Sequence, residues 1–555
     1  MARPSVSRRT FLRGAGGAAL LASGAGSLLT ACGSSGATSE EAQKKAVTAN
    51  KAVKLPTNVP YTGVHPDLAG EFGYVRPGFF SYPKEHPKSV QGEVGSGGSV
   101  SAMANIYYPI PPTAPKNKYW AELNKRLNAD LKMTMVPNAD YTNKFATTIA
   151  GGDLPDFTQI IPVANLPQLL EAKFANLTEF LSGDAIKDYP NLASIPERSW
   201  QACIFNGGIY GIPVPRDAVG GFPFIRADIF EKFGLPTQPK DYEEFHTVAK
   251  GLSDAKAKRW AFATATAVRD LGRTMLSAPN TWHNEGGKLT HRNETEQERR
   301  AVDIARQFWK EGLIHPDAFG QAVPFKQWFN AGTICIHSDG YQGWTQYIQD
   351  NVNTPGFKLD LMLVPAYDGG GPGKISHGGS TFLNGMTGIK KGDKTRIQEL
   401  LRIANWLAAP FGSDEYFFRL YGQEGVHHTI DNNGDPKYTP VGLSETVIPI
   451  RYIAEGPSVT YQPGRKGDVE IQHTYEQTVV PDGIPNPCLG LYSNTQQSKG
   501  ATIDAKLTDE MNAVIQGRKP LSAWDDAVAT WLKEGGEQIR KEYQDQIQER
   551  GANTK

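Results

Sequence analysis

The strongest constraint on the fold is an alternation of strand-like and helical apolar patterns that begins at residue 100. Residues 100–108 alternate loosely between apolar and polar, as in a strand, and residues 117–131 carry apolar side chains at helical spacing. Residues 131–136 then have the pattern of a second strand, and 157–161 form a further apolar stretch after a Gly/Pro turn. A strand, a helix and a strand in this order favour a parallel α/β sheet.

A second α/β block follows the first. Asp241 with Glu244 three residues later is a pattern that begins helices, because both side chains can bond backbone N–H groups of the first turn. A chain of 555 residues is also too long for one ordinary core, so we expect two lobes. In this block the expected elements are strands at 223–225, 332–337 and 359–364, helices at 228–233, 242–252 and 294–311, and a last helix from Ser522.

The charge balance argues against a nucleic-acid partner. Lysine plus arginine and aspartate plus glutamate both number 58, so no basic excess is available to bind phosphates. A composition of 39% hydrophobic and 21% charged residues is typical of globular chains. Beyond residue 32, no apolar run approaches the roughly 20 residues that cross a bilayer.

The first 31 residues have the pattern of an export signal. Residues 7–13, SRRTFLR, resemble the twin-arginine signal, which carries proteins across a membrane already folded, and a weakly apolar uncharged stretch follows. Residues 29–32, LTAC, resemble a lipobox, whose Cys32 would receive a diacylglycerol and become a membrane anchor. An uncleaved anchor helix with an incidental cysteine is the alternative. The favoured interpretation is a twin-arginine lipoprotein signal peptide over 1–31 with lipidation at Cys32.

Two segments separate this signal from the first strand. Residues 32–53 are rich in Ser, Gly, Ala, Thr, Lys and Glu, a composition that buries too little apolar surface to offset the entropy of ordering. We expect a flexible tether there. Residues 54–100 hold many Pro, Gly and aromatic residues without either periodicity, so we expect an irregular extension.

Motifs of catalysis and metal binding are missing from the sequence. It lacks H-E-x-x-H, G-x-S-x-G and G-x-G-x-x-G. The stretch DNNGDP at 431–436 begins like a calcium loop, but proline holds the glycine position, and a hairpin turn is expected instead. Cys203, Cys335 and Cys488 are expected to be packed free thiols, with one disulfide left open. We therefore expect no catalytic residue, no metal and no cofactor.

Six stretches in order along the chain carry a resemblance to one family. They are GGDLPDF (151–157), GGIYGIPVP (207–215), PFIRADIFEKFGLPTQPKDYEEF (223–245), FNAGTICIHSDGYQGW (329–344), YGQEGVHH (421–428) and the C-terminal segment 515–547. Together they resemble extracellular solute-binding proteins of family 1, the lipoprotein receptors of ABC importers for sugars and oligosaccharides. The large lipoprotein-type subgroup is the most similar.

The resemblance implies a two-lobed periplasmic-binding-protein-like α/β fold of type II, with a ligand cleft at the hinge. Ligands of open α/β sheets lie at the carboxyl ends of strands, and hinge closure would bury them between the lobes. Chain crossings near 220, 365 and 440 would give an N-terminal lobe of 101–221 plus 365–440 and a C-terminal lobe of 222–364 plus 441–555.

Sugars present hydroxyl edges and apolar faces, so aromatic rings and polar side chains are the candidates for binding them. In relatives an aromatic in the loop after the 332–337 strand stacks on sugar, which by resemblance points to Trp344, Tyr341 and Asp339. Relatives also place an aromatic in the second lobe, which points to Trp282 and His283. Packing at a helix start or within a loop is the alternative for both tryptophans.

Four more candidates lie near strand ends or the hinge. Arg216 and Asp217 follow a strand close to the first crossing, where a structural ion pair is the alternative. Asp156 precedes the 157–161 strand, and turn chemistry alone could explain it. Tyr107 ends the first strand, where one of two adjacent tyrosines is expected to face the cleft.

The resemblance implies a substrate-binding protein rather than an enzyme. It would sit on the extracellular face of the cell membrane, held by the Cys32 lipid, after export by the twin-arginine route. It would capture a sugar or oligosaccharide and deliver it to ABC permease subunits. A surface-anchored glycoside hydrolase or polysaccharide lyase, and a receptor for a non-sugar solute such as a peptide, are the alternatives.

Overall fold

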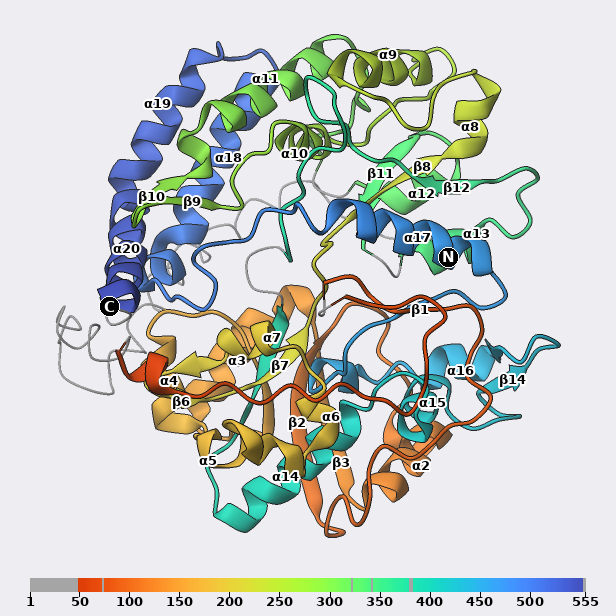
Figure 1. The fold of residues 1–555 in the computed structure, drawn as a ribbon, viewed down its shortest axis with the longest axis vertical. Helices are drawn as coiled ribbons and strands as arrows, with labels where there is room; N and C mark the ends of the chain where they lie inside the picture. Colours follow the sequence, from red (N-terminus) through yellow and green to blue (C-terminus); the bar gives the residue numbers. More distant parts are fainter. Residues whose placement is uncertain (1–47, 72–73, 321–322, 341–342, 379–382, 553–555) are drawn as a thin grey trace, which may run out of the picture.

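The computed structural model describes residues 48–552 except 72–73, 321–322, 341–342 and 379–382. The export signal, Cys32, Tyr341 and most of the expected tether lie outside these described residues. The chain forms two lobes, which lie one above the other in Figure 1. Within the described residues, the helices are too short or too polar to cross a membrane.

A five-stranded sheet forms the centre of the first lobe. Its strands are β2 (Ser99–Ile106), β3 (Asp130–Pro137), β4 (Phe157–Ile160), β7 (Ile212–Pro215) and β13 (Leu383–Ile389). Their order is β3-β2-β4-β13-β7. Strand β2 pairs in parallel with β3 and β4, which confirms the strand–helix–strand prediction, whereas β13 runs antiparallel to both of its neighbours.

Helices cover both faces of this sheet. Apolar residues of α2 (Lys118–Leu127) and α14 (Lys394–Leu407) pack on one face, and those of α3 (Asn138–Gly151) and α4 (Leu166–Lys173) pack on the other. Alternate residues of β2 enter the two cores, as the period of a strand requires. The remaining elements are η1 (Ala114–Lys116), α5 (Thr178–Leu181), η2 (Asp184–Asp188), α6 (Pro190–Ala193), α7 (Glu197–Gln201), β5 (Ile204–Phe205), β6 (Gly208–Ile209), α15 (Asp414–Tyr421), β14 (His428–Ile430), β15 (Pro436–Tyr438), α16 (Pro440–Glu445) and η4 (Pro449–Tyr452).

The second lobe is built on a three-stranded antiparallel sheet of order β11-β8-β12. Strand β8 (Phe222–Arg226) forms where it was predicted, and β12 (Leu359–Leu361) begins where predicted but ends before the expected residue 364. The third, β11 (Ile336–Asp339), begins later than expected, because the residues before it pair with Trp260 instead.

Helices surround this sheet, and α9 (Tyr242–Leu252) begins as predicted. The Asp241 carboxylate accepts a bond from the Glu244 N–H at 2.8 Å, and the Glu244 carboxylate accepts one from the Lys240 N–H at 2.9 Å. The other elements are α8 (Ala227–Lys232), α10 (Ala265–Met275), β9 (Trp282–Glu285), β10 (Lys288–His291), η3 (Arg292–Glu294), α11 (Glu296–Lys310), α12 (Phe325–Asn330), α13 (Gly343–Asp350), α17 (Lys466–Val479), η5 (Gln496–Gly500), α18 (Ala501–Ile515), α19 (Ser522–Trp531), η6 (Leu532–Gly536) and α20 (Glu537–Ala552).

Residues 54–98 form a strap that runs from the first lobe to the second and back. Its first residues hydrogen-bond to the first lobe beside η2. Its middle binds the second lobe, where Arg76 donates to the carboxylate of Glu476 in α17. Its end returns to the first lobe, where the Ser96 N–H donates to Glu399 of α14 at 2.9 Å. Strand β1 (Gly78–Phe79) of the strap pairs in parallel with β16 (Thr460–Tyr461).

Two boundaries differ from the sequence-based expectation. Residues 48–52, expected in the tether, are helical, and the Asn50 side chain accepts a hydrogen bond from the Gly207 N–H at 2.7 Å. The last crossing, expected near 440, lies between η4 and α17. Apolar residues at 448–454 belong to the first lobe because they fill its core.

Two smaller predictions are confirmed. Cys203, Cys335 and Cys488 are buried thiols. The stretch at 431–436 is the turn of the β14–β15 hairpin, and the Asp431 carboxylate holds it by accepting a hydrogen bond from the Asn433 N–H at 2.8 Å.

Candidate functional site

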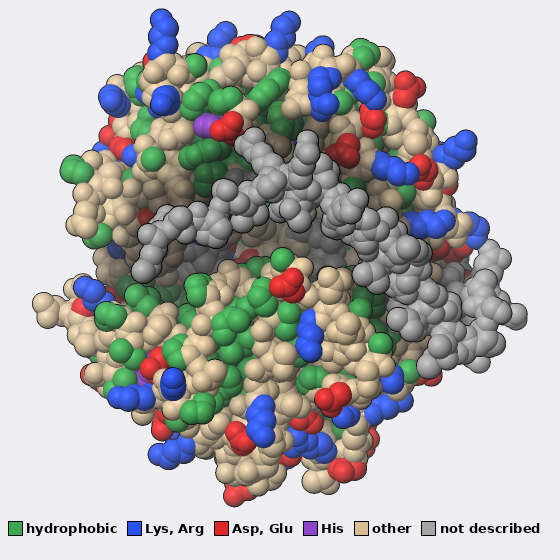
Figure 2. All heavy atoms as spheres, turned by 180° about the vertical axis from the view of Figure 1, so that it is seen from behind, with side chains coloured by type: hydrophobic (Ala, Val, Ile, Leu, Met, Phe, Trp, Pro, Cys, Tyr) green, Lys and Arg blue, Asp and Glu red, His purple; other side chains and the backbone are tan. Residues whose placement is uncertain are grey.

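A cavity of about 790 Å³ lies between the two lobes. Figure 2 shows the surface hollowed between the upper and lower lobes, with hydrophobic side chains on the faces beside the furrow. The first lobe contributes the ends of its strands, and the second contributes α10, the β9–β10 hairpin and the segment from residue 486 to α18. Amide and aromatic side chains line the cavity from the first lobe: Asn105, Tyr107, Asn138, Gln159, Phe205 and Asn384. Charged and aromatic side chains line it from the second lobe: Arg269, Arg273, Trp282, Arg292, Tyr492 and Asp504.

Four amide side chains form a shelf on the first-lobe wall. Asn105, Asn138 and Gln159 lie at the carboxyl ends of β2, β3 and β4, where ligands of α/β sheets bind, and Asn384 lies in β13 beside them. The Asn105 amide donates to Asn138 at 3.0 Å and to the Tyr107 hydroxyl at 2.9 Å. The Oδ1 of Asn105 and the Nδ2 of Asn384 are buried without a partner among the described residues. This amide shelf therefore presents an unpaired acceptor and an unpaired donor.

Aromatic rings line the cavity from both lobes. Tyr107 is 57% exposed, whereas Trp282 is 3% exposed and packs edge-on against His291. Phe205 of the first lobe and Tyr492 of the second meet edge-to-face at 6.3 Å. The Tyr492 hydroxyl also bonds the first-lobe backbone before α4, at 3.1 and 3.2 Å, so the lobes touch at this side of the cavity.

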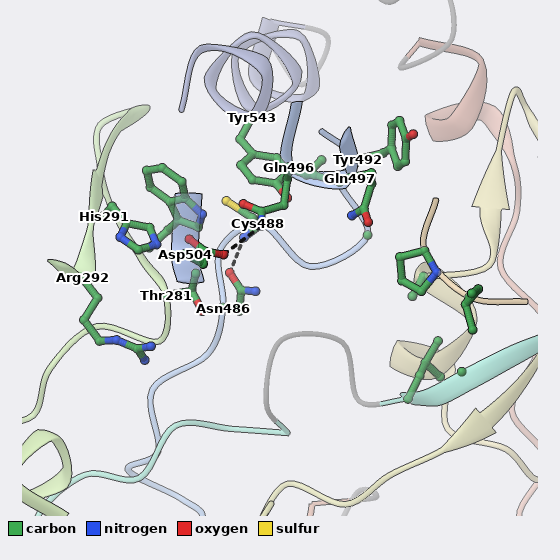
Figure 3. A pocket seen from close by; sticks show the side chains of 18 of the residues that line it. Thr281, His291, Arg292, Asn486, Cys488, Tyr492, Gln496, Gln497, Asp504 and Tyr543 are labelled. Carbon is green, nitrogen blue, oxygen red and sulfur yellow. Dashed lines mark hydrogen bonds between the residues drawn. The ribbon is translucent and has the colours of Figure 1, made fainter. Parts of the chain in front are cut away.

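Three arginines form the opposite wall. Arg273 of α10 grips the buried Glu298 of α11 with two hydrogen bonds of 2.6 Å, and it also donates to Asp270 at 2.7 Å. Arg269 pairs with the same Asp270 at 2.9 Å. Arg292 lies 3.7 Å from Glu298, whose two oxygens are already taken by Arg273. Arg292 is thus the least compensated cation of the wall, and Figure 3 shows its guanidinium at the edge of the cavity.

His291 and Asp504 are neighbours of the arginine wall in the lining of the cavity. Burial, with a further contribution from the surrounding arginines, lowers the pKa of His291 to about 3, so this ring is neutral near pH 7. The Asp504 carboxylate accepts a hydrogen bond from the Trp531 indole at 2.7 Å and one from Gln496 at 3.4 Å. Figure 3 shows Asp504 and Gln496 on the same side as His291.

Of the predicted binding residues, Tyr107 and Trp282 line this cavity. His283, next to Trp282, is exposed on the β9–β10 hairpin and is not among the lining residues. The hairpin replaces the loop that the sequence suggested, and alternation along β9 turns His283 away from the side that Trp282 occupies.

Trp344 and Asp339 take structural positions instead. Trp344 is 0% exposed, and its indole N–H donates to Asp468 at 2.7 Å. This placement corrects the expected stacking role, because the ring has no face open to a ligand. Asp339 accepts a hydrogen bond from Tyr347 at 3.0 Å and pairs with Lys326 at 3.6 Å, away from the cavity lining. Tyr341 lies outside the described residues.

The hinge and turn candidates also have internal partners. The Arg216 guanidinium donates to the carbonyl of Pro215 at 2.8 Å, and Asp217 accepts a hydrogen bond from Ser458. Neither lines the cavity. Asp156 caps the turn before β4: it accepts from the Ser101 N–H at 2.8 Å and pairs with Arg396 at 3.0 Å, as the turn interpretation of this residue requires.

Sequence reasoning missed the amide shelf and the arginine wall. The position of Asn105 and Asn138 at the ends of predicted strands is the signal that could have found them, because the switch-point rule applies to any polar residue there. The arginines had no comparable signal. Arg269 and Arg273 are spaced as one face of an amphipathic helix, which usually indicates solvent exposure.

Comparison with known proteins places these features in a family. The sequence model of the family described as bacterial extracellular solute-binding protein matches residues 118–410. The polygalacturonan/rhamnogalacturonan-binding protein YtcQ of Bacillus subtilis is 25% identical over 489 residues, which are 82% of this chain and 93% of YtcQ. The lipoprotein LipO of the same organism is 23% identical and covers 82% and 94% of the two chains.

Solved structures share the fold at low sequence identity. The N-glycan transport solute-binding protein NgtS of Streptococcus pneumoniae superposes with a TM-score of 0.60 at 15% identity over 82% of this chain and 100% of NgtS. The alginate-binding protein AlgQ2 superposes with a TM-score of 0.57 at 18% identity over 81% and 97% of the two chains. This two-lobed chain therefore belongs to the bacterial extracellular solute-binding protein family.

Proposed function

We propose that the chain is the receptor subunit of an ABC importer for a sugar or oligosaccharide, held on the extracellular face of the membrane by a lipid on Cys32. The ligand would bind between the lobes, and the closed receptor would deliver it to the permease subunits. Membership of the solute-binding family supports a receptor rather than an enzyme.

The observation that carries the sugar assignment is the pairing of the amide shelf with aromatic rings in one interlobe cavity. A buried polar atom without a partner costs about 1–3 kcal/mol. The Oδ1 of Asn105 and the Nδ2 of Asn384 have no partner among the described residues, and they favour a ligand that both donates and accepts. Each sugar hydroxyl does both. The exposed ring of Tyr107 offers a surface for the apolar face of a sugar.

Relatives with named ligands agree with this chemistry. YtcQ is named for polygalacturonan and rhamnogalacturonan, and LipO is named a lipoprotein. The substrate-binding protein FusA of Streptococcus pneumoniae, of the same fold at 16% identity, was solved in complex with kestose. These ligands differ in composition and charge, so they support a saccharide without choosing one.

Calorimetry of the full chain, purified in detergent, against mono- and oligosaccharides tests the proposal, with chromatography of each mixture for products. Stoichiometric binding without product formation supports a receptor. Product release that a single Asp or Glu substitution abolishes would establish the hydrolase or lyase alternative. Binding of peptides but no saccharide would refute the sugar assignment and favour a receptor for a non-sugar solute.

Tyr107→Ala tests the role of the cavity's exposed ring. Loss of a stacking platform is expected to weaken saccharide binding about tenfold, which corresponds to roughly 1.4 kcal/mol. Phe233→Ala is the matched control, because Phe233 is an exposed ring outside the cavity lining. Equal affinities of the two variants would remove Tyr107 from the site.

The export route is tested separately from binding. Arg8→Lys with Arg9→Lys is expected to leave precursor in the cytoplasm, because the proposed signal requires both arginines. Cys32→Ser is expected to release the exported chain from membranes. Normal export of the first variant would refute the twin-arginine route and leave the lipid anchor standing.

A further inference from the structure

We infer, building on the proposed function, that the ligand is an anionic saccharide and that Arg292 binds its carboxylate, as in a uronic acid residue. The site consists of the Arg292 guanidinium on the second-lobe wall and the amide shelf on the first-lobe wall, with the cavity between them.

Two neighbouring arginines of the wall, Arg273 and Arg292, are unequally paired. Arg273 donates three hydrogen bonds of 2.6 to 2.7 Å, two to the carboxylate of Glu298 and one to that of Asp270. Arg292 makes one long hydrogen bond, from Nη1 to the Pro279 carbonyl at 3.5 Å. Its buried Nε has no hydrogen-bond partner among the described residues. The Nη side of Arg292, which has only that long hydrogen bond among the described residues, is therefore available to an acceptor that the protein does not supply.

The surrounding carboxylates are engaged elsewhere. Asp504 accepts from the Trp531 indole at 2.7 Å, and Glu294 pairs with Arg540 at 2.6 Å. Glu298 is 3.7 Å from Arg292 and bound on both oxygens by Arg273. Among the described residues no carboxylate comes closer to Arg292 than the 3.7 Å of Glu298, so the cavity is the side from which a closer partner could come.

Electrostatics supports the same assignment. Burial, followed by repulsion from Arg273, lowers the pKa of Arg292 to about 10, so the group stays charged near pH 7 in a site that disfavours its charge. The side chain is 20% exposed, and Figure 3 shows it beside the open part of the cavity. An anion at this point would restore the favourable environment that burial removes.

A carboxylate fits a guanidinium better than a neutral hydroxyl does. The two oxygens of a carboxylate match the planar fork of arginine in a bidentate pair, and such charge-assisted hydrogen bonds are roughly twice as strong as neutral ones. A neutral sugar would satisfy the amide shelf and leave Arg292 with only its 3.7 Å contact to Glu298. The inference therefore predicts discrimination by charge at constant sugar shape.

Calorimetry with two matched probes tests this prediction. The full chain in detergent is titrated with an oligogalacturonate of three or four residues and with its fully methyl-esterified form, which has the same sugar rings without the charge. We expect esterification to weaken binding about 10- to 100-fold, the range for a hydrogen bond to a charged group. Raising the salt concentration should weaken binding of the acid and leave that of the ester unchanged.

Three variants assign the effect to one residue. Arg292→Gln should bind the acid about 10- to 100-fold more weakly and the ester as tightly as the unmodified chain does. Arg292→Lys keeps the charge without the fork, so an intermediate loss is expected. Arg299→Gln is the control, since Arg299 lies in α11, pairs with Asp525 at 3.0 Å and does not line the cavity. Thermal unfolding of each variant checks that it is folded.

The outcomes separate this inference from the proposed function. Equal binding of acid and ester, or tighter binding of the ester, by the unmodified chain overturns the inference without using any variant. Binding of neutral oligosaccharides with no binding of either galacturonate probe also overturns it and leaves the proposed function standing. Failure of every saccharide, neutral or acidic, overturns both.

Discussion

Replacing Arg76 by methionine would leave the carboxylate of Glu476 buried without its cation. The two side chains are 3% and 1% exposed, and Arg76 donates its Nε to Glu476 at 2.7 Å and its backbone N–H at 2.9 Å. A weaker contact of Arg76, 3.9 Å to Asp217, would also be lost. This ion pair, together with a hydrogen bond between His473 and the Ala69 carbonyl at 2.9 Å, joins the middle of the strap to the second lobe.

The expected cost is large because the charge left behind stays out of water. Removing one partner of a buried pair typically costs about 3–5 kcal/mol of unfolding free energy. Removing both charges costs much less, so Arg76→Met combined with Glu476→Gln should recover most of the loss. The glutamine side chain keeps an oxygen that can accept the hydrogen bond from the backbone N–H of residue 76.

The loss should also depend on pH in a defined direction. Burial raises the pKa of Glu476, and Arg76 is the main group that opposes this rise, so the substitution raises it further. A carboxyl whose pKa is higher in the folded chain than in the unfolded chain destabilises the fold above that pKa. The loss of unfolding free energy caused by Arg76→Met therefore becomes smaller as the pH falls through the folded-state pKa of Glu476. The change is up to about 1.4 kcal/mol per pH unit.

Urea unfolding followed by tryptophan fluorescence at pH 7.5 and 5.0 measures these differences. Lys358→Met is the matched control, because Lys358 pairs with Glu231 on the surface, where both side chains are more than half exposed and a pair contributes about 0–1 kcal/mol. The reasoning fails if Arg76→Met costs no more than the control. It fails equally if its cost is the same at both pH values.

Two further predictions concern residues with close neighbours. The pKa of His291, lowered to about 3 by burial and neighbouring arginines, lies below its value of about 6.5 in the unfolded chain, so the unfolded chain takes up the proton first and stability falls as the pH drops below about 6.5. At pH 5 the loss is about 2 kcal/mol, and urea unfolding of His291→Asn should lack it. Gly442→Ala would place a Cβ 1.9 Å from the carbonyl oxygen of His427, so its melting temperature should drop, at a cost of about 1–3 kcal/mol or more. Gly467→Ala, in a helix with open space around the added Cβ, should instead stabilise by about 0.5–1 kcal/mol, and equal melting temperatures of these two variants would contradict the clash.

The fold could be predicted because its signals are local. The apolar period of residues 117–131 and the cap at Asp241 act within a few residues, and the structure has a helix at each place. The last crossing between the lobes was misplaced because it depends on packing. Nothing in the stretch 441–454 says which of two apolar cores it will fill, and the strands that η4 packs against, β2 and β13, lie far away in the sequence.

The site was harder to predict because exposure is decided by distant segments. Trp344 sits in a Gly-rich stretch with Asp339, which favours an exposed ring in a loop. In the fold, α17 supplies Asp468 to its indole and covers it, more than a hundred residues later in the chain. Tyr107 has an equally plain sequence context and is 57% exposed at the cavity.

The roles of the wall arginines were also not predictable from the sequence. Arg273 and Arg292 have the same chemistry and lie near the same carboxylate, yet their roles differ because Glu298 projects from α11 with both oxygens toward α10. One bidentate pair is thereby completed within the protein, and the second guanidinium is left without an equivalent acceptor. Residue type defines what a side chain can bind, and the competition among neighbours for one carboxylate defines what remains free to bind a ligand. Two probes of the same shape that differ in charge measure directly what remains free to bind, which is why they test the assignment of Arg292 better than any comparison of sequences.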